Sequence, residues 1–131
     1  MATMFYAGQT DYIDKLNILA NAGATNRSSV VINSGNISID ISSAAIFTIT
    51  LTTNITSVSF TNPNSSGTIS KFILEFTANG TAHTIAWPST VKWSNGTPPT
   101  MTSTLNKKDA FSFYTYDGGV TYIASIIGQN L

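Results

Sequence analysis

Apolar and small polar residues alternate along residues 36–61, NISIDISSAAIFTITLTTNITSVSFT. Three runs in which every second residue is apolar begin at Ile37, Phe47 and Val58. Successive side chains of a β-strand point to opposite faces of a sheet, so a period of two is typical of strands that bury one face. This stretch therefore predicts three half-buried strands.

The same alternation continues toward the C-terminal end of the chain. It recurs in four further runs, which are Phe72, Leu74 and Phe76, then Ile85 and Trp87, then Phe111 and Phe113, and last Tyr122, Ala124 and Ile126. Asn79-Gly80 and Asp117-Gly118 lie between such runs and predict hairpin reversals, because these residue types tolerate the positive φ of tight turns. Residues 97–106 hold two prolines and are expected to connect one sheet to the other.

The spacing of these runs predicts the fold class. Short strands at roughly 10-residue intervals, each with one apolar face, favour two sheets packed face to face or a closed barrel. We expect an all-β fold, an antiparallel jelly-roll-like β-sandwich that occupies residues 25–131. No internal repeat of roughly 20–50 residues is visible, so a solenoid is not suggested.

A different period precedes the strands. Between Thr10 and Ala22 four apolar residues follow the spacing of one face of a helix, and they are Tyr12, Ile13, Leu16 and Leu19. Thr10 is a suitable N-terminal cap, and Gly23 offers a stop. Residues 1–8 contain Met4, Phe5 and Tyr6 and no turn signal. We therefore expect residues 1–24 to form an arm and a short amphipathic helix. The helix would rest on its own sandwich or on a neighbouring subunit, and the arm would dock on a partner.

The composition indicates a protein that assembles. Only 9% of the 131 residues are charged, where an ordinary soluble domain has about 25%, and the formal net charge is zero. Ser (16), Thr (20) and Asn (12) supply small uncharged hydrogen-bonding groups in place of ions. A net charge near zero favours association. We therefore expect a surface that binds other subunits.

Several partners and locations are disfavoured by the same composition. Nucleic-acid binding needs a basic stripe, and Lys107-Lys108 is the nearest approach to one. No apolar stretch reaches the ~18–20 residues that span a bilayer. The start of the chain, Met1 to Met4, lacks the features of a signal peptide, so we expect a cytoplasmic protein and discount the six Asn-x-Ser/Thr triplets as glycosylation sites.

The residues that usually carry catalysis are scarce. The chain has no cysteine, one histidine (His83) and one glutamate (Glu75), whereas hydrolytic sites combine a nucleophile, a base and an orienting group. Asp117 beside Gly118-Gly119 indicates a hairpin turn before it indicates a calcium ligand. Glu75 is expected on the outer face of its strand, where it and Lys71 or Lys92 serve solubility or form a cross-strand pair. We therefore expect no enzyme activity, no metal site and no cofactor.

Aromatic residues gather near the C-terminal end. Trp87 and Phe113 lie on period-two positions, which is typical of a β core. Tyr114 and Tyr116 fall on the face opposite Phe111 and Phe113, so they are candidates for a subunit contact. A stacking platform for sugars or single-stranded nucleic acid is the alternative interpretation of these aromatic residues.

The C-terminal third of the chain also follows a recognisable order. Its residues are Ile85-Ala86-Trp87-Pro88, Val91-Lys92-Trp93, Gly96-Thr97 with Pro99, Asp109, Phe111-Ser112-Phe113, and Asp117-Gly118-Gly119 with Thr121-Tyr122. This order resembles that of small β-sandwich structural proteins of tailed bacteriophages, both capsid decoration (cement) proteins and tail-fibre domains. The chain departs from their pattern at Tyr122, where tryptophan is common, and at Asn95, where glycine is common. Asparagine also accepts a positive φ, so the turn is kept.

The resemblance implies a virion component without enzymatic activity, of a kind that is often trimeric. We expect a capsid decoration protein, made in the host cytoplasm and located on the capsid surface, that binds the major capsid protein and its own copies as a homotrimer. The expected partner-binding residues are Met4, Phe5, Tyr6, Tyr12, Leu16, Tyr114 and Tyr116. The alternative is a tail or fibre component, either an adaptor or a receptor-binding head that contacts host-surface carbohydrate through Trp93, Tyr114 or Tyr116. A secreted lectin-like module is a third, more distant hypothesis.

Overall fold

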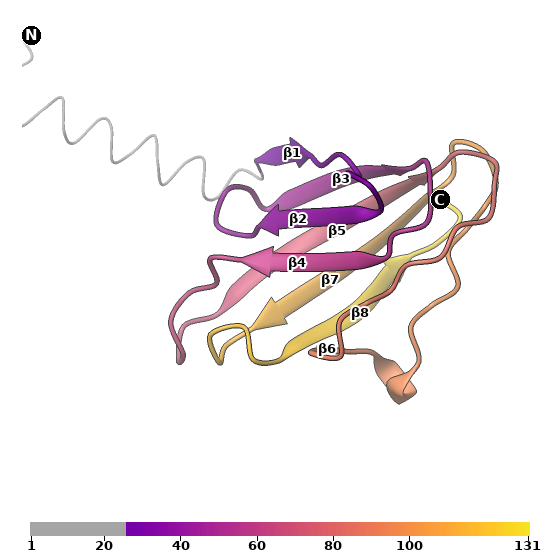
Figure 1. Ribbon diagram of the computed structural model, residues 1–131. Coiled ribbons are helices and arrows are strands. Elements are labelled where there is room, and N and C mark those ends of the chain that lie inside the picture. Colours follow the sequence, from indigo (N-terminus) through magenta and orange to yellow (C-terminus); the bar gives the residue numbers. More distant parts are fainter. Residues whose placement is uncertain (1–25) are drawn as a thin grey trace, which may run out of the picture.

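The computed structural model describes residues 26–131 (Figure 1). The arm and helix predicted for residues 1–24 lie outside the described residues, as do Met4, Phe5, Tyr6, Tyr12 and Leu16. The strands are β1 (Arg27–Ser29), β2 (Asn36–Asp40), β3 (Ile46–Leu51), β4 (Ser57–Thr61), β5 (Ser70–Ala78), β6 (Val91–Lys92), β7 (Lys108–Thr115) and β8 (Tyr122–Gly128). Residues Ser94–Gly96 form one short 3-10 turn, η1. The prediction of an all-β fold is confirmed. No helix among residues 26–131 has the length and apolar character needed to cross a membrane.

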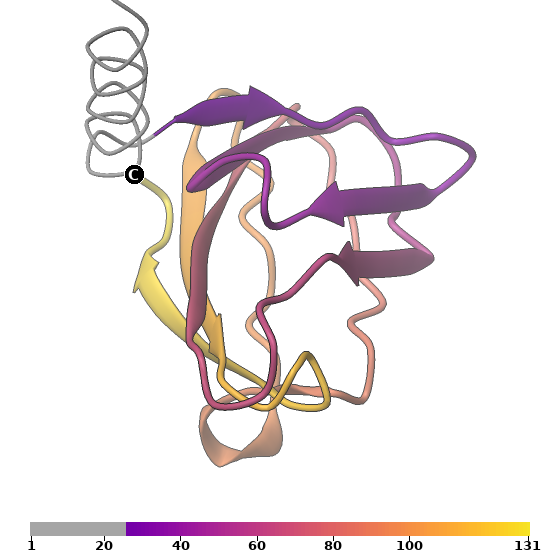
Figure 2. The same ribbon diagram turned by 90° about the vertical axis from the view of Figure 1, so that its left-hand side faces the viewer.

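The strands form two sheets. The larger sheet has six strands in the order β1-β3-β5-β7-β8-β6, and the smaller one pairs β2 with β4. The smaller sheet lies over one face of the larger (Figures 1 and 2). The other face of the six-stranded sheet is called the outer face below.

The direction of the strands differs from the prediction. Four of the six strand pairs are parallel, namely β1 with β3, β2 with β4, β3 with β5, and β6 with β8. The expectation of an antiparallel arrangement is therefore wrong for most of the fold. The reason is that the chain alternates between the two sheets from β1 to β5 and returns to each sheet in the same direction. Alternating apolar residues predict that a strand has a buried face, but they carry no information about direction.

This winding makes the first half of the domain similar to the first turns of a solenoid. Ile37 of β2 is in register with Val58 of β4, and Phe47 of β3 is in register with Leu74 of β5. Apolar side chains thus stack from one turn onto the next. The turns differ in sequence, which is why a search for internal repeats does not find them.

The C-terminal hairpin completes the larger sheet. β7 and β8 are antiparallel and lie between β5 and β6, so the reversal predicted at Asp117-Gly118 is confirmed. The reversal predicted at Asn79-Gly80 is not a hairpin, because β5 pairs with β7 and not with the segment that follows it. Asn79 instead accepts a hydrogen bond from the backbone of Thr81 at 3.1 Å. Residues 97–106 connect β6 to β7, two strands of the same sheet, and so do not cross between sheets as predicted.

The core fills the space between the two sheets. Its largest fully buried side chains include Phe47, Phe76, Phe111 and Phe113 of the larger sheet and Ile37 and Ile39 of the smaller one. Phe60 reaches across from β4, with its ring centroid 5.0 Å from that of Phe72 and 4.9 Å from that of Tyr122. The inward-facing runs are confirmed with two exceptions. Ile126 is 50% exposed, because the register of β7 and β8 shifts beside Phe111. Ile85 makes only an isolated bridge with Ile55.

Candidate binding surface

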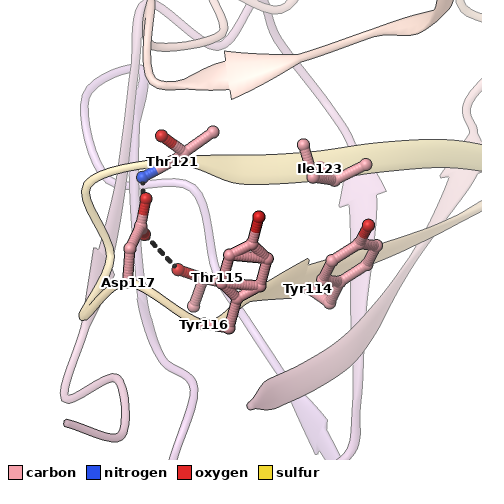
Figure 3. A pocket seen from close by; sticks show the side chains of 6 residues that line it. All are labelled: Tyr114, Thr115, Tyr116, Asp117, Thr121 and Ile123. Atoms are coloured by element: carbon pink, nitrogen blue, oxygen red, sulfur yellow. Dashed lines mark hydrogen bonds between the residues drawn. The ribbon is translucent and has the colours of Figure 1, made fainter. Parts of the chain in front are cut away.

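Two tyrosines stand on the outer face of the β7–β8 hairpin. Tyr114 is 38% exposed and Tyr116 is 60% exposed, and their ring centroids are 6.3 Å apart at an angle of 31°. Both point away from Phe111 and Phe113, which are buried, so the predicted facing is confirmed. Ile123 of β8 lies opposite Tyr114 in the register. We call Tyr114, Tyr116, Thr121 and Ile123 the tyrosine surface (Figure 3).

The turn that ends the hairpin is fixed by a network around Asp117. One carboxylate oxygen of Asp117 accepts a hydrogen bond from the Thr115 hydroxyl at 3.0 Å and another from the Thr121 backbone N–H at 2.9 Å (Figure 3). The Thr115 hydroxyl in turn accepts from the N–H of Gly119 at 3.1 Å. The hydrogen bond from Thr121 is the main reason why the pKa of Asp117 lies below its ordinary value. The network is local, so it holds the turn and the strand end that carries Tyr116.

The Asp117 network fits the predicted turn better than a cation site. The carboxylate oxygen that faces the turn already accepts two hydrogen bonds from the chain itself. Within residues 26–131, His, Asp and Glu nowhere gather in the groups of three or more that hold metal ions. Asp117 therefore acts on the shape of the hairpin.

The hollow beside the two tyrosines is small. Its volume is about 80 Å³, and its lining includes Tyr114, Tyr116, Asp117 and Ile123. Pockets for small molecules of drug size have volumes of roughly 300–1,000 Å³. A hollow of this size holds a few water molecules or one inserted side chain. The surface therefore suits a broad contact better than an enclosed ligand.

Two further apolar side chains are exposed in the loops near the tip of the hairpin. Val120 in the turn is 69% exposed, and Ile69 in the preceding connection is 50% exposed. The two loops are joined, because the carbonyl of Tyr116 accepts a hydrogen bond from the N–H of Gly67 at 2.8 Å. Neither residue follows a strand alternation, so the sequence pattern did not single them out.

The charged residues near this surface are few. Lys71 lies opposite Tyr114 in the register of β5 and β7. Glu75 pairs with Lys108, with 3.8 Å between a carboxylate oxygen and the ammonium nitrogen. The predicted partners of Glu75, Lys71 and Lys92, are therefore wrong. The reason is that β5 pairs with β7, which brings Lys108 beside this carboxylate, whereas Lys92 donates to the carbonyl of Ser89 at 2.8 Å.

Other candidate residues are placed elsewhere. Trp93 is only 8% exposed and packs against Trp87, with 5.2 Å between ring centroids. A side chain so buried cannot offer its face to a sugar, so the suggested carbohydrate contact through Trp93 is wrong. The Nε2 atom of His83 lies 3.0 Å from the side-chain oxygen of Asn79. Both atoms belong to the loop after β5, and the tyrosine surface contains neither residue.

The outer face also carries apolar residues that sequence reasoning missed. Ile73 of β5 and Ile46 of β3 are half-buried neighbours in the register. The run Phe72-Ile73-Leu74 breaks the alternation, and this break is the signal that both faces of β5 are apolar.

No protein-family model, curated protein or solved structure matches the chain.

Proposed function

We propose that this chain is a structural protein of a bacteriophage virion. In this proposal it is a capsid decoration protein that binds the major capsid protein on the outside of the shell and assembles as a homotrimer. The order of residues in the C-terminal third, which resembles such proteins, supports this assignment. The domain is then a β-sandwich in which Phe60 joins the facing sheets. The jelly-roll part of the predicted fold is not retained, because four strand pairs are parallel.

The tyrosine surface is the single observation that carries the proposal. Exposed aromatic side chains with few charges around them are typical of protein–protein interfaces. Tyr114 and Tyr116 offer broad apolar area together with hydroxyl groups, and the hollow that both of them line is too small for most ligands. A protein that binds only the assembled shell stabilises that state, and symmetry repeats each weak contact many times. A sparsely charged contact of this kind depends little on salt.

Attachment to shells tests the proposal. Purified protein is incubated with shells of the virus from which the chain comes, and bound protein is measured by co-sedimentation. Tyr116→Ala is expected to weaken attachment by about 30-fold, the effect of a side chain worth about 2 kcal/mol in an interface. Leu105→Ala is the matched control, because Leu105 is also 60% exposed but lies in the connection between η1 and β7. Equal attachment of both variants would show that the tyrosine surface is not the contact.

A tail or fibre component is the second candidate function. The observation that favours it is the pair of tilted tyrosine rings beside Thr121, because aromatic faces next to polar groups also suit carbohydrate. Counting copies on the particle distinguishes the two. Hundreds of copies on the shell support decoration, whereas a handful at the tail support the second candidate. Specific glycan binding that Tyr114→Ala abolishes without loss of folding would also support the second candidate.

A further inference from the structure

The outer face of the six-stranded sheet carries one row without charge. The register places Ile46 of β3 beside Ile73 of β5, Ile73 beside Ser112 of β7, and Ser112 beside Ser125 of β8. The two serine hydroxyls lie 2.7 Å apart, so they hydrogen-bond to each other. Ile46, Ile73 and Ser112 are half-buried, and Ser125 is exposed. We call these four residues the outer row.

A ridge runs along one side of the outer row. Lys71, Tyr114 and Ile123 form it, because they occupy the next outward-facing positions of β5, β7 and β8 and are in register with one another. The large ring of Tyr114 beside the small Ser112 leaves a groove of about 470 Å³, lined also by Ala45 and Ile73. The groove is therefore floored by isoleucine and serine and walled by Tyr114 and Lys71.

The undescribed part of the chain ends beside this groove. The carbonyl of Asn26, the first described residue, accepts hydrogen bonds from the N–H groups of Ala45 and Ile46, both at 3.0 Å. Arg27 is then in register with Ile46, the first member of the outer row. The preceding segment contains the apolar stripe Tyr12, Ile13, Leu16 and Leu19. Only a few residues therefore separate this apolar stripe from Arg27, which lies beside the outer row.

We propose that residues 10–22 pack as a helix across the outer row of their own chain. Thirteen helical residues extend ~20 Å at 1.5 Å each. The distance from β1 across β3, β5 and β7 to β8 is about four strand spacings, or ~19 Å. Three residues of helix advance ~4.5 Å, close to one spacing, so Leu19 lies over Ile46 and Leu16 lies over Ile73. Gly23 to Thr25 allow the chain to turn between this helix and β1.

The charges of the segment agree with this placement. Successive helical residues are rotated by ~100°, which places Asp14 ~160° from the centre of the stripe and Asp11 ~140° from it. Both carboxylates therefore stay in water when the stripe faces the sheet. The outer row itself holds no charge, and the one charged residue that lines the groove, Lys71, is exposed at its side. The proposal does not depend on the identity of the shell or receptor that the domain binds.

Disulfide trapping in the full chain tests this packing. The chain has no cysteine, so each introduced pair is the only one present. Leu16→Cys with Ile73→Cys, and Leu19→Cys with Ile46→Cys, are expected to form intramolecular disulfides under mild oxidation, because a disulfide needs Cα atoms within about 7 Å. Asp14→Cys with Ile73→Cys is the control, and it is expected to react about tenfold more slowly, since Asp14 faces water. Products are identified on non-reducing gels and by mass spectrometry.

The outcomes separate this packing from other occupants of the groove. Disulfide-linked dimers from the first two pairs would overturn the proposal by placing a second copy on the outer row. Equal rates for the test and control pairs would overturn it as well. Amide hydrogen exchange on the unmodified full chain gives an independent check that needs no variant. Protection of residues 12–22 is expected, and exchange at the rate of an unstructured peptide would also contradict the proposal.

Discussion

Asp109 shows how a single charged residue organises the C-terminal end of the domain. It is 2% exposed, and its carboxylate accepts hydrogen bonds from the backbone N–H groups of Thr102 at 2.7 Å and Asn130 at 3.0 Å. The side chain of Gln129 adds a third at 3.2 Å. Burial alone would raise the pKa of this carboxyl. The hydrogen bonds together lower the pKa by more than burial raises it, so the pKa lies below its ordinary value. The carboxylate thus ties the connection before β7 to the residues after β8.

The lowered pKa of Asp109 makes stability depend on acid. The unfolded chain binds a proton at the ordinary pKa of 3.8, whereas the folded chain binds it only at a lower pH. The stabilising contribution is therefore complete above pH ~4 and is lost as the pH falls through the folded-state pKa. Asp109→Asn is expected to lower the free energy of unfolding at pH 7 by about 1.5–3 kcal/mol and to flatten its acid dependence. Urea unfolding from pH 2.5 to 7 measures both effects.

Asp40→Asn is the matched control for Asp109→Asn. The pKa of Asp40 is also lowered, chiefly by hydrogen bonding to the Ser42 side chain, but its carboxylate lies at the surface. We expect Asp40→Asn to change the free energy of unfolding at pH 7 much less than Asp109→Asn does. Similar effects of the two substitutions would mean that the buried network around Asp109 contributes no more than a solvated turn.

At the scale of elements, the β7–β8 turn depends on a close approach at Gly119. This residue has a φ of +86°, and a Cβ there would lie 2.8 Å from the hydroxyl of Tyr122 and 3.0 Å from a ring carbon of Pro63. Gly119→Ala is therefore expected to combine backbone strain with a clash, at a cost of about 2–4 kcal/mol in the free energy of unfolding. Chemical denaturation measures this loss.

Gly67→Ala separates strain from clash. Gly67 also has a positive φ, of +95°, but a Cβ there has open space around it. Its substitution is expected to cost only the strain, about 1 kcal/mol. If Gly119→Ala costs no more than Gly67→Ala, the contact of Gly119 with Tyr122 and Pro63 does not constrain the turn.

How far the sequence predicts this fold differs between elements. The strand at Phe47 and the hairpin at Asp117 could be predicted, because side-chain period and turn chemistry are local properties. The parallel pairing of β3 with β5 could not, since it depends on which strands meet after a long connection. The outward facing of Tyr114 and Tyr116 could be predicted because these residues alternate with buried ones. The row around Ile73 could not be predicted, because its neighbours Ile46 and Ser112 come from distant parts of the chain.

At the scale of the whole molecule, the described domain has a core of its own. Among residues 26–131, the buried apolar side chains that fill it come from both sheets and their connections, between Ile37 and Ala124. Residues 1–8 lie outside the described residues, and their sequence places the large side chains of Met4, Phe5 and Tyr6 together without a turn signal. Such a cluster is expected to act outside the domain. In the proposed arrangement a helix across the outer row would carry this arm to the β8 side of the sheet, toward Ile123 of the tyrosine surface.

Removing residues 1–8 is therefore expected to separate folding from attachment. The shortened chain should unfold as cooperatively as the full chain, since the core is intact, and circular dichroism during heating measures this. Its attachment to shells should weaken by about tenfold or more, because the buried area of three apolar side chains is lost from the contact. Replacing Met4, Phe5 and Tyr6 with serine in the full-length chain should reproduce the loss, which distinguishes side-chain contacts from chain length. Equal occupancy of shells by the shortened and full-length proteins would show that the arm does not bind the partner.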